Sequence, residues 1–329
     1  MNLIENQNND YIKRILFDFY GIESQEIRRT EEGLQNENYI IETLDGKKFV
    51  LKKRIKQIYD LKSPIDRERN IAEIVYQISK KLPFIIAPRV NTRGNWITSN
   101  KDGIFLLYKF CNGIHEEYEN PEIVGQVGEA ISKFHNESKE YIDNCIVKGD
   151  RSFDTHIEML KHNKAFYEKY LKSFIEGFEE MNQDNGNTTT IIHADLTPYN
   201  VIFLNRELRG IIDFDNIRVS SREEEVIRFL TSISNKPELA AEFIRRYQRI
   251  SSDSLNLTKG NIKYFVYKDL IEEIGIWHEK IVTKSFAKDS SFYIENLANT
   301  IQRMNKVDRS IERLETAINQ ISIVEEERE

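Results

Sequence analysis

The sequence is poor in cysteine and contains no long apolar run. Cys111 and Cys145 are its only cysteines, they form no CxxC pair, and no histidine cluster lies near them. A disulfide framework or a zinc site is therefore not expected, and a reducing compartment is the natural location. The absence of any run of about 18 apolar residues argues against a membrane-spanning helix. Residues 1–10 lack the apolar core of a signal peptide. We therefore predict a cytoplasmic protein.

The sequence also lacks the excess of basic residues that a general nucleic-acid binder would show. Its formal net charge is −7, from 47 Lys and Arg against 54 Asp and Glu. This balance is typical of a solvated acidic surface and, less specifically, of a preference for cationic small substrates. With 40% hydrophobic and 31% charged residues, the composition is that of a folded globular protein. A chain of 329 residues exceeds one ordinary core, so we expect two lobes.

The first third of the chain mixes strand and helix patterns. Residues 9–20 carry apolar side chains at helical spacing. Asp45-Gly46, between two apolar runs, is a strong hairpin signal because this pair tolerates positive φ. Pro64 is suited to the first position of a helix. Residues 104–110 form an apolar run that is typical of a buried strand.

From residue 120 onward the pattern is mostly helical. Long helical stretches are expected at about residues 154–181, 223–248, 259–285 and 290–322. The change of pattern falls near residue 111. We therefore predict an α+β fold with two domains, residues 1–110 and residues 111–329. A cleft between two such lobes is the expected place for a ligand.

One stretch interrupts the helical part of the chain. Two short apolar runs flank a polar turn at Arg206-Glu207. A hairpin folded about this turn would bring Asn200 and Asp213 to the same open end. Asp195 precedes Asn200 by five residues, in a loop that Pro198 keeps non-helical.

Three oxygen-bearing side chains would thus meet at one place. Asn200 and Asp213 offer the oxygen ligands that Mg²⁺ prefers, and such an ion keeps waters and phosphate oxygens in its remaining positions. Asp195 is placed to orient an incoming hydroxyl group and to accept its proton. Phosphoryl transfer needs this kind of positioning and charge neutralisation more than covalent help from the protein. The alternative, that all three are solvated turn residues, must explain the His-x-Asp pattern, the spacing and the hairpin together.

The pattern His193-Ala-Asp195-Leu-Thr-Pro-Tyr-Asn200, followed by Ile211-Ile-Asp213-Phe, resembles the catalytic and metal-binding signatures of the aminoglycoside phosphotransferase family. That family also includes choline kinases and homoserine kinase-like enzymes. The resemblance implies a bilobal protein-kinase-like fold, with a small antiparallel-sheet N-terminal lobe and a mostly helical C-terminal lobe. It implies that Asp195 is the catalytic base and that Asn200 and Asp213 hold Mg²⁺. His193 would brace the loop through backbone hydrogen bonds.

The resemblance also implies a nucleotide site in the first lobe. Residues 33–39 look like the nucleotide loop of the family, and Lys52, on the strand of residues 49–52, would contact the ATP phosphates. The carboxylate partner of Lys52 is Glu68 or Glu73. We prefer Glu68, because it lies on the apolar stripe of its helix, where an unpaired charge would be costly to bury. Glu73 lies on the polar face of the same helix.

The segment before Gly113 would be the hinge between the lobes. There the Lys109 carbonyl and the Cys111 amide would bind adenine. The cofactors that the resemblance implies are ATP and Mg²⁺. The sequence lacks the G-x-G-x-x-G loop and the A-P-E motif of protein kinases. This favours a small-molecule acceptor over a protein.

The sequence leaves the acceptor open among amino-alcohols, amino acid alcohols and aminoglycoside-like compounds. One candidate acceptor site is an acidic, aromatic pocket for a cation, made by Glu272, Glu273 and Trp277. Alternatively, these residues are exposed acids and a core tryptophan on one long helix, and we prefer this second interpretation. The competing hypothesis for the whole chain is a catalytically silent kinase-like protein with a role in an assembly. No nucleic-acid or membrane partner is expected. The oligomeric state is open, and we favour a monomer.

Overall fold

The computed structural model describes residues 3–30, 36–54, 64–147, 151–181, 188–233, 235–284 and 289–326. The chain forms two compact units. The first comprises Met1–Ile114 and Arg209–Asp215, and the second comprises His115–Leu208 and Asn216–Glu329. The first unit thus includes a short segment of chain from far beyond the domain boundary predicted at residue 110.

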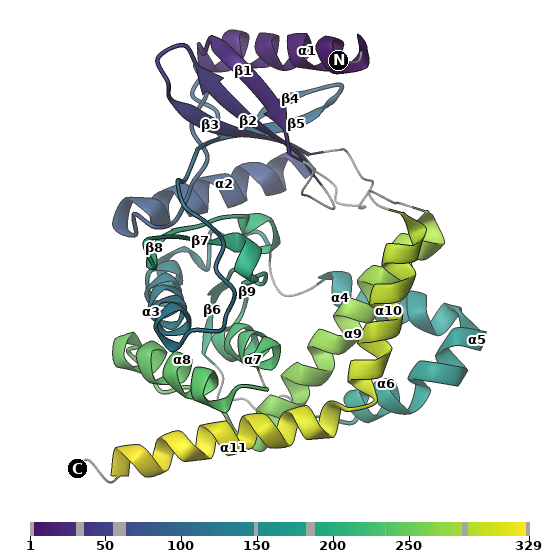
Figure 1. Cartoon of the computed structure of the whole chain (residues 1–329). Helices are drawn as coiled ribbons and strands as arrows, with labels where there is room; N and C mark the ends of the chain where they lie inside the picture. The colour runs from purple at the N-terminus through teal and green to yellow at the C-terminus, as the bar shows by residue number, and fades with distance from the viewer. Residues whose placement is uncertain are drawn as a thin grey trace. The chain divides into compact units, whose positions relative to one another are not determined.

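The first unit is built on a five-stranded antiparallel sheet (Figure 1). Its strands are β1 (Ser24–Arg29), β2 (Asn36–Thr43), β3 (Lys48–Arg54), β4 (Thr98–Asn100) and β5 (Gly103–Lys109), in the order β1-β2-β3-β5-β4. β2 and β3 form the predicted hairpin, with Ile40 opposite Val50. The turn that joins them places Gly46 at φ +75°, a left-handed conformation that glycine adopts without steric cost.

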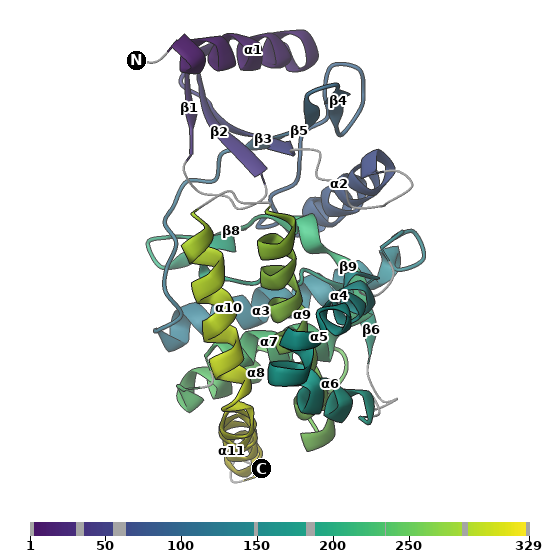
Figure 2. The same ribbon diagram turned by 90° about the vertical axis from the view of Figure 1, so that its right-hand side faces the viewer.

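Two helices cover opposite faces of this sheet (Figures 1 and 2). α1 (Leu3–Tyr20) packs on the face that carries Leu51. α2 (Pro64–Lys81) packs on the face that carries Leu106. Because neighbouring residues of a strand point to opposite faces, Lys52 lies on the same face as α2.

A distant segment, which begins within β8 (Glu207–Ile211), completes the first unit. Ile211 forms a parallel bridge with Ile85. Gly210 lies against the thiol of Cys111, and a Cβ at this position would be 2.7 Å from that sulfur. A larger residue at position 210 would therefore push this segment, and the acidic residues that follow it, away from Cys111.

The second unit is mostly helical. Its helices are α3 (Pro121–Ser138), α4 (Arg151–His162), α5 (Lys164–Phe166), α6 (Lys172–Glu179), α7 (Arg222–Ser232), α8 (Pro237–Ile250), α9 (Lys259–Thr283), α10 (Ser290–Met304) and α11 (Val307–Glu326), with the shorter η1 (Lys139–Tyr141), η2 (Tyr167–Leu171) and η3 (Pro198–Asn200). α9 and α10 lie side by side (Figure 2). None of the helices in the described ranges is both long and apolar enough to cross a membrane.

Two small sheets accompany these helices. β6 (Thr189–Ile192) pairs antiparallel with β9 (Arg218–Ser221). β7 (Val201–Leu204) pairs with β8 in the two-stranded sheet expected from the sequence. A further short turn, η4 (Phe214–Asn216), follows β8. The segments before β7 and after β8 carry the predicted catalytic and metal-binding residues.

Several of the predicted long helices are divided in the structure. The stretch 154–181 is split into α4, α5, η2 and α6, and the side chain of Asn163 caps the start of α5. The stretch 223–248 is split into α7 and α8, because Pro237 begins α8 and has no N–H with which to continue an earlier helix. The stretch 290–322 is split into α10 and α11. Apolar spacing continues across such short breaks, so periodicity alone did not show them.

α3 and α8 approach each other closely at two glycines of α3. A Cβ at Gly128 would lie 2.6 Å from the carbonyl oxygen of Phe243, and a Cβ at Gly125 would lie 2.5 Å from a side-chain atom of α8. This close contact lets the hydroxyl of Tyr247 on α8 reach the ring of His135 on α3, at 2.7 Å. The spacing of the two helices therefore depends on residues without side chains.

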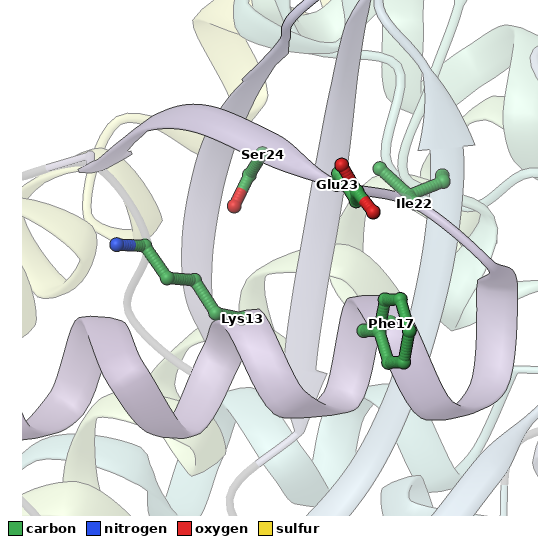
Figure 3. A pocket seen from close by; sticks show the side chains of 5 residues that line it. All are labelled: Lys13, Phe17, Ile22, Glu23 and Ser24. Carbon is green, nitrogen blue, oxygen red and sulfur yellow. The ribbon is translucent and has the colours of Figure 1, made fainter.

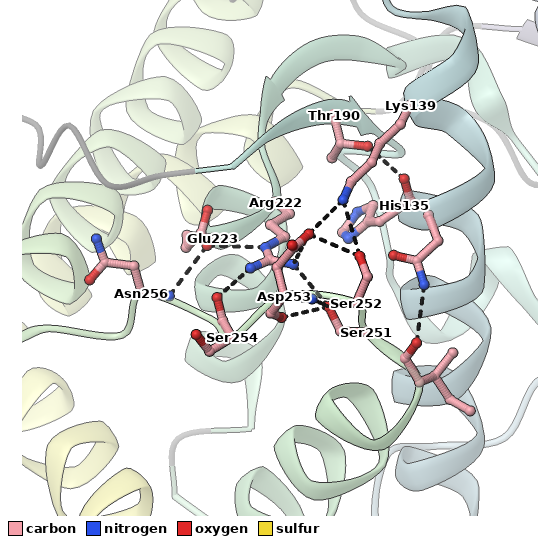
Figure 4. Close-up of polar contacts among 12 residues, drawn as sticks. His135, Lys139, Thr190, Arg222, Glu223, Ser251, Ser252, Asp253, Ser254 and Asn256 are labelled. Carbon is pink, nitrogen blue, oxygen red and sulfur yellow. Dashed lines mark hydrogen bonds and ion pairs between the residues drawn. The ribbon is translucent and has the colours of Figure 1, made fainter.

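Arg222 anchors the start of α7 to the loop that follows α8 (Figure 4). Its side chain is only 1% exposed and forms an ion pair with Glu223 at 3.2 Å. Its guanidinium also donates to the hydroxyl of Ser251 at 2.9 Å and to the carbonyl of Ser254. Glu223 in turn accepts the N–H of Asn256 at 3.3 Å. One buried charge pair thus fixes both the helix and the loop.

We predict that Arg222→Met lowers the free energy of unfolding by about 3 kcal/mol, because it leaves the carboxylate of Glu223 buried without its cationic partner. Urea unfolding followed by circular dichroism measures this loss. Arg245→Met is the matched control, because Arg245 pairs with Glu242 at the surface of α8 and its side chain is 46% exposed. We expect less than about 1 kcal/mol for the control. Equal losses for the two variants would contradict the anchoring role of Arg222.

Candidate active site

The loop that carries Asp195 follows β6 and is held by the side chain of Glu225 on α7. Glu225 accepts the backbone N–H of His193 at 3.0 Å and that of Ala194 at 2.6 Å. The N–H of Asp195 donates to Nδ1 of His193 at 3.2 Å, which is the backbone bracing expected of this histidine. Two side chains thus fix the backbone on the N-terminal side of Asp195.

Ala194 adopts a backbone conformation that is unfavourable for alanine. Its φ is +64°, in the left-handed region, at a cost of about 1 kcal/mol for a residue with a Cβ. Both of its backbone polar groups are bound by α7: the N–H donates to Glu225, and the carbonyl accepts a hydrogen bond from Arg228 at 2.9 Å. These two contacts, one turn apart on the same helix, offset the cost of the conformation.

Glu225 is fully enclosed, with 2% of its residue surface exposed. Burial alone would raise its pKa, but the hydrogen bond and charge of His135, together with the nearby His193, outweigh burial and hold the pKa of Glu225 below its usual range. His135 Nε2 lies 2.8 Å from the carboxylate of Glu225, and Nδ1 lies 2.7 Å from the hydroxyl of Tyr247. A chain of hydrogen bonds thus runs from α8 through α3 and α7 to the loop that carries Asp195, the predicted catalytic loop.

Asn200 ends η3, and its side chain turns back to the loop. Its Nδ2 donates to the carbonyl of Asp195 at 2.8 Å, and the N–H of Thr197 donates to the same carbonyl at 3.0 Å. Asn200 is buried, whereas Asp195 is half-buried. Because Nδ2 is engaged within the loop, Oδ1 is the side-chain atom that remains for a ligand, and an amide oxygen is a donor that Mg²⁺ accepts.

Arg228, on α7, is a contact of this loop that the sequence did not indicate. Besides the Ala194 carbonyl, it contacts two acids of α9: it pairs with Asp269 at 2.6 Å and with Glu272. Glu272 is 44 positions away in the sequence, so no local pattern marks the pair. Through Arg228, α9 is bound to the backbone of the catalytic loop.

Glu272, Glu273 and Trp277 do not form an open cation pocket in this structure. Glu272 is buried and pairs with Arg228. Glu273 pairs with Arg303 at 2.7 Å and accepts the indole N–H of Trp277 at 3.4 Å. Because arginines already neutralise both acids, the structural interpretation of these residues is favoured over a site for a cationic substrate.

The polar centre of the first unit is formed by Lys52 and two acids that flank Phe214. Lys52 Nζ lies 2.7 Å from Asp213 Oδ1 and 2.6 Å from Asp215 Oδ2. Lys52 is buried, whereas Asp213 is partly exposed and has φ +64°. The predicted phosphate-binding lysine and the predicted metal ligand Asp213 are therefore brought into contact.

Two arginines extend this cluster. Arg54 pairs with Glu68 at 2.9 Å and with Asp215 at 2.8 Å. Arg67 pairs with Glu68 at 2.9 Å and also donates to the backbone carbonyl of Asp215 at 2.7 Å. Together with Lys52 and Asp213, these residues place three cations against three carboxylates.

Glu68 is buried on α2, as its position on the apolar stripe predicted, and Glu73 is exposed. The contacts of Glu68 differ from the expected ones. Its carboxylate pairs with Arg54 and Arg67, whereas the amine of Lys52 contacts the two acids around Phe214. Sequence spacing identified the buried acid of α2 but not the arginines that surround it.

The charges in this cluster shift one another's pKa values in opposite directions. Burial and the nearby Asp215 raise the pKa of Asp213. Burial would also raise the pKa of Asp215, but Lys52 and Arg54 outweigh it and hold that pKa well below its usual range. Burial would lower the pKa of Lys52, yet Asp215 and Asp213 raise it above its usual value. The structure therefore keeps Lys52 charged and Asp215 ionised.

Lys109 and Cys111, the predicted adenine-binding positions, lie at and just after the end of β5. The Lys109 side chain is exposed. Cys111 is half-buried, and burial raises the pKa of its thiol. Between them, the N–H of Phe110 donates to the carbonyl of Lys48 at 3.1 Å, so this segment is fixed to β3. Residues 33–35 of the predicted nucleotide loop lie outside the described residues.

Hollows also occur among the described residues of the first unit. One of about 210 Å³ lies between α1 and the start of β1 and is lined by Lys13, Phe17, Ile22, Glu23 and Ser24 (Figure 3). None of these residues belongs to the predicted site. Another borders Glu68, Tyr108 and Asp215 and holds only about 10 Å³, roughly the space of one water molecule. The cluster of three cations and three acids is therefore closely packed on this side.

A model of the phosphotransferase enzyme family matches residues 26–257, which cover all the predicted site residues. The chain belongs to this family. The membership confirms the resemblance seen in the sequence and, at the level of the family, the predicted class of phosphotransferase.

Individual relatives are distant. A homoserine kinase from Rhodopseudomonas palustris (strain BisB5) is 24% identical over 190 residues, and the matched part is 56% of each chain. The chain therefore spans about half the length of this curated relative. A spectinomycin phosphotransferase solved with ADP and spectinomycin has a TM-score of 0.63 at 14% identity, with 94% of this chain and 98% of that chain covered.

A second solved structure, of an amicoumacin kinase with AMP-PNP, Ca²⁺ and amicoumacin, has a TM-score of 0.68 at 12% identity, with 93% of this chain and 96% of that chain covered. At such low identity these likenesses show the fold alone. They confirm the predicted α+β, protein-kinase-like fold class.

We predict that Glu225→Gln disorders the catalytic loop, because glutamine keeps the shape of the side chain but offers one acceptor oxygen where the loop amides use two. Loss of the charge-assisted hydrogen bonds should lower the free energy of unfolding by about 2 kcal/mol. It should also speed amide hydrogen exchange at His193 and Ala194. Glu238→Gln, at an exposed position of α8, is the control. Unchanged exchange at the two amides would show that Glu225 does not hold the loop.

Proposed function

We propose that this chain transfers the γ-phosphoryl group of ATP to a hydroxyl group of a small molecule, with Mg²⁺ as the metal. The observation that supports this most strongly is the Asp195 loop. Its backbone is bound on both sides of Ala194, and Asn200 is tied to Asp195 by a hydrogen bond. Such rigid placement of a half-buried carboxylate suits a base that must meet an incoming hydroxyl group at a fixed position.

In this proposal Asp195 orients the acceptor hydroxyl and takes its proton as the oxygen attacks the γ-phosphorus. The bond from that phosphorus to the bridging oxygen breaks, and ADP leaves. Asn200 Oδ1 and the carboxylate of Asp213 would hold Mg²⁺, which neutralises phosphate charge when bound. Two protein ligands suit this ion, because it keeps waters and phosphate oxygens around itself. No group of three or more His, Cys, Asp or Glu side chains in the described ranges is arranged to hold a metal.

The remaining roles concern the nucleotide. Lys52, kept charged by its acidic neighbours, would contact the ATP phosphates, with Glu68 as a buried carboxylate of the same cluster. The carbonyl of Lys109 and the amide of Cys111 would bind adenine, which leaves their side chains free to vary. Residues 1–110 would act as the nucleotide-binding lobe and residues 111–329 as the acceptor lobe.

The acceptor is proposed as an amino-alcohol, an amino acid alcohol or an aminoglycoside-like compound. Three of the similar proteins are named for small-molecule acceptors: a homoserine kinase, a spectinomycin phosphotransferase and an amicoumacin kinase. We further propose that the protein acts in the cytoplasm as a monomer. A panel of such alcohols with γ-labelled ATP and Mg²⁺ tests the activity. Absence of both turnover and ATP binding would overturn the proposed function.

We predict that Asp195→Asn lowers kcat by roughly 10²–10⁴-fold, the usual contribution of a general base. ATP affinity should be unchanged, because the asparagine retains the shape of the side chain and the proposed contact of Asp195 is with the acceptor. Phosphoryl transfer is measured with labelled ATP, and ATP affinity by calorimetry.

Asp143→Asn, at an exposed position of the second unit, is the control for this variant. If the biological activity of the protein survives Asp195→Asn in full, phosphoryl transfer is not its function. That result would favour the silent, assembly-related alternative.

A further inference from the structure

Asp215 is the residue on which the polar groups of the first unit converge. One carboxylate oxygen accepts hydrogen bonds from Lys52 at 2.6 Å and from the side-chain amide of Asn36 at 3.0 Å. The other oxygen pairs with Arg54 at 2.8 Å. The backbone carbonyl accepts a hydrogen bond from Arg67 at 2.7 Å. These four partners come from β2, β3 and α2, so Asp215 joins three elements of the unit.

Glu68 makes a different set of contacts. Its two carboxylate oxygens are engaged by Arg54 and Arg67, each at 2.9 Å. Lys52, in contrast, places its amine 2.7 Å and 2.6 Å from Asp213 and Asp215. Arg54 and Arg67 therefore stand between Glu68 and Asp215, and each contacts both residues.

The order of residues along β3 explains this arrangement. Lys52 and Arg54 are two positions apart, so their side chains leave the strand on the same face. Both reach Asp215, with Lys52 bound to one carboxylate oxygen and Arg54 to the other. The carboxylate is thus held at both oxygens, which fixes its plane and the direction in which it holds the amine of Lys52.

We propose that Asp215, not Glu68, is the carboxylate that positions Lys52, and that Glu68 acts indirectly by holding Arg54 and Arg67 against Asp215. The inference rests on the proposed function, in which Lys52 contacts the ATP phosphates and Asp213 is a metal ligand. A lysine ammonium has three donors. With Asp213 committed to the metal, Asp215 remains to orient Lys52 and leaves donors free for phosphate. Asp215 is in this sense a positioning residue, because it acts through Lys52.

Double-mutant cycles on the unliganded protein test the pairing itself. The unfolding equilibrium constant is measured in urea for Lys52→Met, Asp215→Asn, Glu68→Gln and the two double variants that contain Lys52→Met. Directly paired residues should be non-additive by roughly tenfold, and residues that interact only through others by much less. Coupling to Lys52 that is as large for Glu68 as for Asp215 would overturn the proposal.

Nucleotide affinity tests the role of the pairing. We expect Asp215→Asn to weaken ATP binding by roughly tenfold, close to the effect of Lys52→Met, and Glu68→Gln to have a smaller effect. The KM for ATP should rise while the KM for the acceptor stays constant, which general loss of structure would not produce. Glu73→Gln, on the exposed side of α2, is the matched control. Normal ATP affinity in Asp215→Asn, with weakened binding in Lys52→Met, would also overturn the proposal.

The two measurements separate this inference from the proposed function. If Lys52→Met leaves ATP binding unchanged, Lys52 does not contact phosphate and the proposed function loses that role, whereas the unfolding cycles still decide which acid is paired with Lys52. If Asp215→Asn does not fold, the cycle between Lys52 and Glu68 decides alone. Near-additivity in that cycle supports the proposal, and tenfold coupling contradicts it.

Discussion

The geometry of the loop that carries Asp195 depends on one buried carboxylate, Glu225, that accepts two consecutive backbone N–H groups. The left-handed conformation of Ala194, at φ +64°, is unfavourable for alanine, and both backbone polar groups of this residue are bound from outside the loop. Glu225 and Arg228 bind the N–H and the carbonyl of the same residue from one face of α7. The position of Asp195 therefore depends on the position of α7, and Arg222 anchors the start of that helix.

Charge balance has a similar role in the first unit. Lys52 and Glu68 are buried, and Arg54, Asp213 and Asp215 beside them are partly buried. The loss of hydration would be costly for any of these charges alone. The cost is offset only where every charge has partners at hydrogen-bond distance, and the cluster around Asp215 meets that condition. In the second unit, Arg228 with Asp269 and Glu272 follows the same rule. Both clusters hold a proposed site residue, or the backbone beside it, in a single arrangement.

Much of the fold could be predicted because it depends on local pattern. Asp45-Gly46 fixed the hairpin of β2 and β3, the apolar run of residues 104–110 became β5, and the apolar stripe of α2 placed Glu68 on the buried side. The loop motif from His193 onward was recognisable because its chemistry needs particular residue types at fixed spacing. Helix boundaries were predicted less well, since apolar periodicity runs across the short breaks at Asn163 and Pro237.

The partners of the site residues could not be predicted in the same way. Arg54, Arg228 and Asp215 look like ordinary charged residues in the sequence. Their importance comes largely from contacts that no local spacing encodes, such as that of Arg228 with Glu272, 44 positions away, and that of Asp215 with Lys52, 163 positions away. A rule that prefers a buried acid on a helix found Glu68, but it gave no information about which cation would reach that acid. Long-range charge pairing is thus the part of such a site that sequence patterns describe least.

The contact of α3 with α8 at Gly125 and Gly128 restricts which substitutions the sequence can accept in evolution. At Gly128 the contact is with the backbone carbonyl of Phe243, so the distance between the helices there cannot be adjusted by altering a rotamer. The same distance sets whether Tyr247 reaches His135, and so whether the hydrogen-bond chain to Glu225 is complete. A side chain at position 128 would force α3 and α8 apart and could break the hydrogen-bond chain that reaches the loop of Asp195 through Glu225. Substitution at this remote helix contact is therefore restricted by packing and also by the hydrogen bonds that position the loop of Asp195.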